Sequence, residues 1–250
     1  MGSVDARLRD AALRAARNNA EWCDAVCRAH GLRGEFGEDA WTCARRTPRY
    51  YPDAVTLSPD ASAERVLSRI DVGAGCSIKD SFARLDPTSW GFRVLFEAEW
   101  IHREPPEAGP PGGAWRPVRD AAGLRAWEAA WGDGQEEPGL FPPALLAEPT
   151  VALLGGWSGG RLIAGCAANL GPAVVGISNL FVRAGDPDAA WAGVVAAAAS
   201  HFPGHPVVGY ERDEPLAAAM RQGFSPAGRL RVWLREAAEA AGGTGTAASS

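Results

Sequence analysis

The order of predicted elements between residues 151 and 235 constrains the fold of this chain most. Three apolar runs follow one another, separated by the turns Ser158-Gly159-Gly160 and Gly171-Pro172, and this pattern predicts three consecutive strands. A helix, a strand, a second helix and a last strand come next. The expected strands are 151–157, 162–170, 174–182, 207–210 and 230–235, and the expected helices are 188–201 and 214–222. Few domains combine elements in this order.

Composition places the chain among ordinary globular proteins. It has 250 residues, of which 46% are hydrophobic and 22% charged, so it can form one large domain or two small ones. The net charge of −5 argues against a general attraction to nucleic acid. No apolar run approaches the roughly 20 residues of a membrane span, and residues 1–17 lack a secretory apolar block. We expect a cytoplasmic protein without a membrane partner.

The cysteines and the basic residues suggest no metal site. Five scattered cysteines form no disulfide framework, which fits a reducing compartment, and Cys23 and Cys27 lie one turn apart inside a predicted helix rather than on a CxxC turn. Buried thiols and no metal are expected. Lys79 is the only lysine among 25 basic residues. With much Ala, Gly and Trp, this bias indicates high-GC coding, as in actinobacteria, and we interpret Lys79 as accidental.

A Pro/Gly-rich break divides the chain. The segment 104–113 (EPPEAGPPGG) cannot continue a helix or strand, so we predict a linker at 105–113. It separates an N-terminal α/β domain (1–104) from a second domain (114–236), and the low-complexity tail 237–250 is expected to be disordered. In the first domain we expect helices at 6–29, 62–70 and 77–85 and strands at 53–57 and 91–102. Before residue 151 the second domain adds a strand at 115–118 and helices at 121–131 and 141–147.

This succession of elements resembles the GCN5-related N-acetyltransferase (GNAT) family. Two N-terminal segments, GEFGEDAW (34–41) and YPDAVTL (51–57), also resemble those of actinobacterial GNAT-like proteins. The resemblance implies an α/β (α+β) fold with a mixed, mostly antiparallel sheet flanked by helices, and it leaves room for a degenerate GNAT-like half at the N-terminus. The activity it implies is transfer of an acetyl or other acyl group from acyl-CoA to an amine of a small molecule or peptide.

The resemblance also implies an acyl-CoA site. In the family, strands like 174–182 and 207–210 part like a V, the first binds the pantetheine arm, and the next loop holds the pyrophosphate at a helix N-terminus. The loop 183–188 keeps one arginine and one glycine, lacks the second glycine and carries two aspartates. Either the phosphate contacts shift to Arg183 and the helix start, or CoA is not the natural ligand. The cofactor-binding residues that follow are Asn179, Leu180, Phe181, Val182, Arg183, Gly185, Ala190 and Trp191.

The catalytic residues are less well marked. Members of the family carry a tyrosine that acts as the general acid at the position where this chain has Ala219. Tyr210 is therefore the candidate general acid, and Glu211 is the candidate general base, acting through water. A core-capping Tyr210 and a solvated Glu211 are the structural alternatives. Glu97 and Glu99 share one face of a strand and could hold the substrate amine, unless Arg93 simply neutralises them.

Two further functions stay open. The same fold could take its acyl group from another carrier, namely a carrier protein or aminoacyl-tRNA, although the negative charge disfavours tRNA. The chain could also be a non-catalytic ligand-binding module derived from the GNAT fold. The sequence predicts neither the acceptor, nor the acyl chain, nor the oligomeric state.

Overall fold

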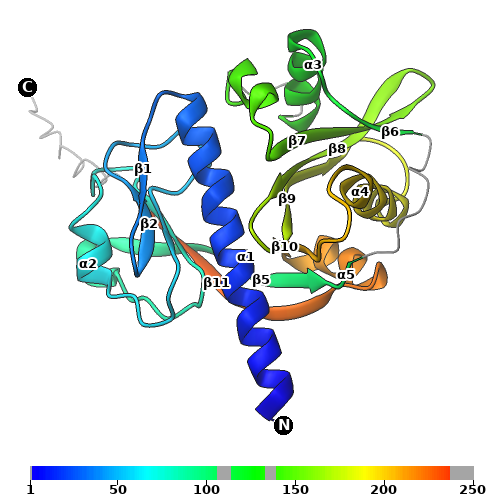
Figure 1. The fold of residues 1–250 in the computed structure, drawn as a ribbon. Helices are drawn as coiled ribbons and strands as arrows, with labels where there is room; N and C mark the ends of the chain where they lie inside the picture. The colour runs from blue at the N-terminus through cyan, green and yellow to red at the C-terminus, as the bar shows by residue number, and fades with distance from the viewer. Residues whose placement is uncertain (1, 106–113, 133–138, 237–250) are drawn as a thin grey trace, which may run out of the picture.

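One mixed β-sheet runs through the chain (Figure 1), in a computed structural model that describes residues 2–105, 114–132 and 139–236. Within these residues the strand order is β1-β2-β3-β4-β11-β5-β10-β9-β8-β7-β6, and only the pairs β3–β4 and β9–β10 are parallel. The strands are β1 Gly34–Phe36, β2 Ala40–Cys43, β3 Ala54–Thr56, β4 Ser77–Asp80, β5 Phe92–Arg103, β6 Trp115–Pro117, β7 Val151–Ser158, β8 Arg161–Leu170, β9 Val175–Val182, β10 Val207–Glu211 and β11 Ser225–Arg235.

Helices cover both faces of the sheet. Neighbouring residues of β10 show the two layers: Val208 packs in a cluster with α1, whereas Val207 packs in a cluster with α4 and α5. α3 packs with α1 on its face, and α2 packs on the face opposite α1. The helices are α1 Gly2–Ala29, α2 Ala63–Leu67, α3 Ala121–Trp131, α4 Pro187–His201 and α5 Asp213–Arg221, with 3₁₀ turns η1 Thr88–Trp90 and η2 Pro143–Ala147.

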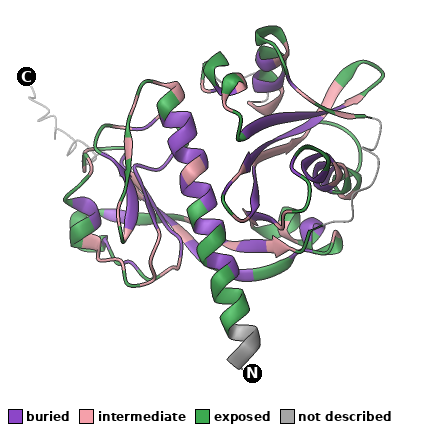
Figure 2. Ribbon diagram, in the orientation of Figure 1, coloured by how far each residue is buried: buried purple, intermediate pink, exposed green. Residues whose placement is uncertain are grey.

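The long helix α1 crosses the sheet in front of β11 and β5 (Figure 1) and joins the two halves of the chain. Its alanines Ala12, Ala15 and Ala16 are buried against Trp100 and Leu230, because small side chains let the helix approach the strands closely. Figure 2 shows buried residues over much of its length and exposed ones toward its N-terminal end. The predicted helix at 6–29 is confirmed and begins earlier, at Gly2.

The strands of the two predicted domains interleave in the sheet. β5, from the first half, lies between β10 and β11, and β11, from the second half, lies between β4 and β5. Most of the predicted linker (106–113) and the tail 237–250 lie outside the described residues. Each half therefore completes the hydrogen bonding of the other.

The predicted order of the second half is confirmed: three strands, a helix, a strand, a helix and a strand appear as β7, β8, β9, α4, β10, α5 and β11. The helix predicted at 77–85 is wrong. Ser77–Asp80 is strand β4, which pairs with β3 and β11, and a turn follows in which the Asp80 carboxylate accepts hydrogen bonds from the backbone N–H groups of Phe82 and Leu85 at 3.3 and 2.8 Å. Strands β1 and β2 are not predicted at all.

The side chains of β5 do not alternate regularly along the whole strand. Regular alternation predicts that Phe92 shares a face with Phe96 and Trp100, yet it packs with Trp233 on the α2 face, whereas Trp100 packs with α1. A register shift against β11 between Val232 and Trp233 leaves Leu95 without a partner residue. This bulge reverses the alternation of side chains along the strand.

Strands β9 and β10 part after a short contact, as expected. They pair only at Val175–Val207 and Gly176–Val208, and β9 continues to Val182 without a β10 partner. A register shift between β8 and β9 accompanies a left-handed backbone at Asn179, whose φ is 54°. The sheet therefore opens between the carboxyl ends of these two parallel strands.

Candidate functional site

The opening between β9 and β10 is the centre of the candidate site. In open α/β sheets, ligands bind at the carboxyl ends of strands where neighbouring strands part. Here the β9 side carries Asn179 to Val182, and the β10 side carries Tyr210 and Glu211, which follow each other and so point to opposite faces of the sheet. The structure thus brings the predicted catalytic pair and the predicted arm-binding strand to one opening.

Asn179 is held in place by side chains from two distant segments. Its Oδ1 accepts hydrogen bonds from Trp22 Nε1 on α1 at 3.0 Å and from the Tyr51 hydroxyl at 3.3 Å. Both donors are buried, and burial raises the pKa of the Tyr51 phenol, so it stays a neutral donor. The bulge of β9 is therefore fixed by α1 and by the segment before β3, which sequence analysis did not connect with it.

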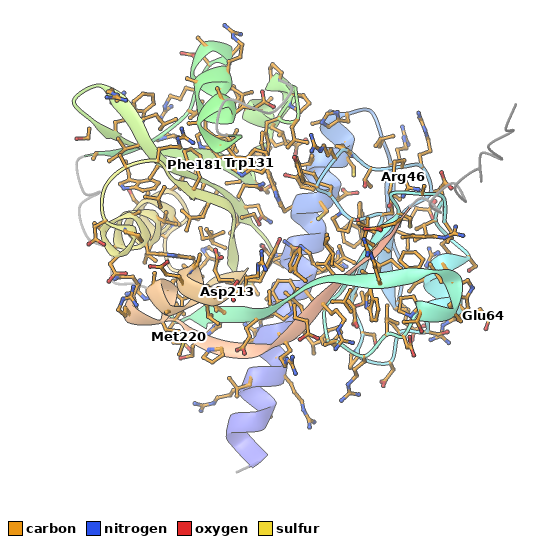
Figure 3. The ribbon with its side chains drawn as sticks, turned by 180° about the vertical axis from the view of Figure 1, so that it is seen from behind. Arg46, Glu64, Trp131, Phe181, Asp213 and Met220 are labelled. Atoms are coloured by element: carbon orange, nitrogen blue, oxygen red, sulfur yellow. The ribbon has the colours of Figure 1, made fainter. Side chains whose placement is uncertain are left out.

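A cavity of about 990 Å³ adjoins the opening on the α1 side of the sheet. Its floor is formed by β4, β5, β9, β10 and β11, and its rim by the segment 46–52 and the end of α3. Figure 3 labels Arg46 and Trp131, which line the cavity from these two segments. The two segments of the rim contact each other through the rings of Tyr50 and Trp131, which pack edge-on with their centroids 5.6 Å apart.

Lys79 lies inside this cavity, although the sequence interpretation treats it as accidental. Its side chain is 5% exposed, and Nζ donates a hydrogen bond to Asn19 Oδ1 at 2.7 Å. The same ammonium lies 4.1 Å from the centroid of the Tyr210 ring, and that ring packs edge-on against Trp100 at 5.6 Å. The signal in the sequence is that Lys79 is the only lysine of the chain.

Glu211 ends β10 on the face opposite Tyr210. It is half-buried, and burial raises the pKa of its carboxyl to about 7. Its partner across the β10–β5 ladder is Glu99. A carboxyl with this pKa changes protonation state near neutral pH, as a general base must.

The predicted substrate-binding glutamates lie apart from the cavity. Glu97 accepts hydrogen bonds from Arg231 Nη2 at 2.6 Å and Arg229 Nη2 at 2.5 Å, and the Arg231 bond is the main cause that lowers its pKa. Glu99 is opposite Arg229 on β11 and Glu211 on β10. Neither glutamate is among the cavity-lining residues.

Two carboxylates, those of Asp186 and Asp188, lie at the start of α4 and form hydrogen bonds within the protein. Asp186 Oδ1 accepts the backbone N–H of Asp188 at 3.1 Å, and Arg221 holds the Asp188 carboxylate with two bonds of 2.7 Å, which lowers the Asp188 pKa. Gly185 is exposed with φ 98°, beside the exposed Arg183. A diphosphate here would meet two carboxylates, so these residues do not fit that end of CoA, whereas the unpaired edge of β9 fits its neutral arm.

The remaining predicted cofactor residues are largely packed. Ala190 and Trp191 are 8% and 2% exposed, with Trp191 against Phe224, so only their backbone could contact a ligand. Phe181 lies against Trp127, with ring centroids 5.3 Å apart, and Figure 3 shows it on the same side of the view as Trp131. Leu180 packs against the core under α4, and Val182 pairs with Ala164.

The described residues offer neither a metal-binding cluster nor a membrane-spanning helix. Residues 2–105, 114–132 and 139–236 contain no group of three or more His, Cys, Asp or Glu side chains that could hold a metal ion. In the same part of the chain, no helix has the length and apolar character needed to cross a membrane.

Comparison with known proteins identifies the fold class. No protein-family model matches the sequence, and no curated protein matches it. A GCN5-related N-acetyltransferase from Kribbella flavida superposes with a TM-score of 0.62 at 14% identity, covering 92% of this chain and 97% of that one. A GNAT-family structure from Novosphingobium aromaticivorans gives 0.56 at 13% identity, covering 86% and 99%. The chain therefore has the GNAT fold, which confirms the predicted mixed, mostly antiparallel sheet.

Proposed function

We propose that this chain is a GNAT-type N-acyltransferase, which moves an acetyl or other acyl group from a thioester to the amine of a small molecule or peptide. The opening between β9 and β10 carries this proposal, because it offers a slot for a slender arm beside a cavity large enough for an acceptor. The GNAT fold of the two neighbours supports it at the level of the fold.

The acyl donor enters with its arm along β9. Beyond Gly176 this strand has no β10 partner within the described residues, so its peptide groups are available to the amides of a pantetheine arm. Backbone N–H groups near Asn179 and Phe181 would polarise the thioester carbonyl, as an oxyanion hole does. Acyl-CoA is the donor we propose, bound mainly through its arm.

The chemistry is a direct transfer. The amine nitrogen attacks the thioester carbonyl carbon, a C–N bond forms, and the C–S bond breaks. Glu211 takes the proton from the amine through a water molecule, and Tyr210 gives its proton to the departing thiolate. The raised pKa of Glu211, about 7, suits a base that works near neutral pH.

A thermal-shift series with free CoA and its esters, followed by an assay of thiol release, tests this function. Acetyl-CoA should raise Tm through binding to the native state, and thiol release should depend on added amine. No shift with any CoA ester, together with no amine-dependent release, contradicts the proposal.

A second candidate is the same fold using another acyl carrier, or a ligand-binding module without catalysis. Two observations favour it. The position of the family's tyrosine is Ala219, which is fully buried in the core, and Asp186 occupies the helix start where a diphosphate would bind. Stabilisation by an acylated carrier protein or by aminoacyl-tRNA, without a response to CoA esters, would support it.

The acidic loop gives a prediction about affinity. Because Asp186 repels phosphate, acetyl-CoA and acetyl-pantetheine should bind with similar Kd. Asp186→Ser keeps a helix-capping oxygen but removes the charge, and should tighten acetyl-CoA about two- to fivefold. Acetyl-pantetheine should be unaffected, which makes it the control in isothermal titration calorimetry. An unchanged acetyl-CoA affinity in the variant would show that the diphosphate lies elsewhere.

A further inference from the structure

The cavity beside the opening contains a buried cation without an anionic partner. Lys79 is 5% exposed, and its Nζ contacts the neutral Asn19 Oδ1 and the face of Tyr210. Among the described residues Lys79 forms no ion pair with a carboxylate. Burial of a charge is costly unless an opposite charge compensates it, so the native state favours a bound anion at this point.

The charged side chains in the described lining of the cavity are all cationic. Its described lining includes Lys79, Arg46 and Arg49 but no aspartate or glutamate. Arg46 is paired with the buried Asp53 outside this lining, so its charge is partly compensated, while that of Lys79 is not. The field inside the cavity therefore attracts a negative group and opposes a ligand whose only charge is an ammonium.

The rest of the lining is apolar and aromatic. Rings of Tyr50, Tyr51, Phe96, Trp131 and Tyr210 face the space, together with aliphatic side chains of β5 and β11. Such walls bury flat or branched hydrocarbon well, and a few polar groups then orient the ligand.

We propose that the cavity binds an organic acid with an apolar or aromatic body, whose carboxylate is held by the ammonium of Lys79. As acceptor of the proposed transfer, this ligand is an amino acid, with its amine directed toward the opening between β9 and β10. The identity as acceptor rests on the proposed function, but the binding itself does not.

Binding of matched acids and amides tests the charge requirement on the wild-type protein. The probes are L-phenylalanine, L-tryptophan and L-leucine, each beside its carboxamide, and 3-phenylpropanoate, which lacks the amine. Calorimetry should show at least one of the acids binding about tenfold or more tightly than its amide, since a charge-assisted hydrogen bond to Nζ is lost in the amide. A panel in which no acid binds more tightly than its amide overturns the proposal.

Variants test whether Lys79 causes the preference for the acid over the amide. Lys79→Met keeps the length of the side chain and removes the charge, so the preference for the acid should disappear, while Lys79→Arg should retain part of it. Arg125→Gln removes a cation from the exposed surface of α3 and should leave the preference intact. Because Lys79→Met removes an uncompensated buried charge, its Tm should not fall, and Tm measurement checks this. Persistence of the acid preference in Lys79→Met also overturns the proposal.

An acyl-transfer assay distinguishes the binding of an organic acid in the cavity from the proposed transferase function. Thiol release from acetyl-CoA that appears with an amino acid, and not with 3-phenylpropanoate, supports the acceptor role. Tight, Lys79-dependent binding of acids without any transfer supports the binding inference and counts against the transferase function.

Discussion

A Glu211→Gln variant is expected to lose about 100-fold or more in kcat for amine acylation, because proton transfer by a positioned base contributes roughly 10²- to 10⁴-fold. Glutamine keeps the shape of the side chain and cannot accept the proton. Glu211 is not among the residues that line the cavity, so KM for the acceptor should change little. Steady-state thiol release with the best amine acceptor measures both constants.

The pH profile should change with the same substitution. In the wild type, kcat should rise as the Glu211 carboxyl loses its proton around pH 7 and should level off above that. In Glu211→Gln this rise should be absent. A wild-type rate that falls through pH 7 would show that the carboxyl acts as an acid.

Folding stability reports on the same carboxyl without any substrate. Burial raises its pKa from 4.5 to about 7, so the native state binds the proton more tightly than the unfolded state. The stabilisation from the neutral carboxyl is complete below about pH 4.5 and is lost as pH rises through about 7. At 1.36 kcal/mol per pKa unit, the loss is about 3 kcal/mol. Urea unfolding of Glu211→Gln should lack this decline.

Glu214→Gln is the matched control for both measurements. Glu214 is exposed in the first turn of α5, three residues from Glu211, and carries the same charge. Its variant should keep the wild-type kcat and the wild-type pH dependence of stability. If Glu211→Gln also keeps them, Glu211 is a solvated residue at a helix start and the base lies elsewhere.

Local patterns account for the part of the fold that was predicted. Apolar runs ended by Ser158-Gly159-Gly160 and Gly171-Pro172 define β7, β8 and β9, since a turn needs only neighbouring residues. The local pattern of β4 predicts a helix, because what makes this segment a strand is its pairing with distant residues. Lys79, for example, pairs with Val232 of β11. A strand of four residues with an alternating, half-polar pattern carries too little local signal to be distinguished from a helix.

The difference between local patterns and contacts to distant residues also explains which residues of the candidate site could be predicted. Tyr210 and Glu211 are candidates because the resemblance to the GNAT family points to the strand that holds them, and their catalytic roles stay a prediction. The support of Asn179 by Trp22 and Tyr51 is not predicted, because both residues lie more than 100 residues before Asn179 and form no motif with it. The rarity of lysine singles out Lys79 but does not predict a role for it, since rarity does not reveal that a side chain is buried next to Asn19 and Tyr210.

Asp53→Ala is expected to destabilise the protein by about 2–5 kcal/mol, because buried backbone donors lose their acceptor and each unsatisfied donor costs about 1–3 kcal/mol. Asp53 is 1% exposed, and its carboxylate accepts bonds from Arg46, from the backbone N–H groups of Thr47 and Ser77 at 3.0 Å each, and from the Thr47 hydroxyl at 3.3 Å. Alanine leaves the backbone N–H groups of Thr47 and Ser77 without this acceptor in the interior.

The effect should reach the cavity, because Asp53 anchors the segment 46–52 that forms its rim. Urea unfolding measures the free energy of unfolding, and the acid probes report on the rim through their Kd, which should rise. Asp60→Ala, at an exposed position in the same half, should change stability by less than about 0.5 kcal/mol. A loss below about 1 kcal/mol for Asp53→Ala would mean that water replaces the carboxylate, and that the rim does not depend on this charge.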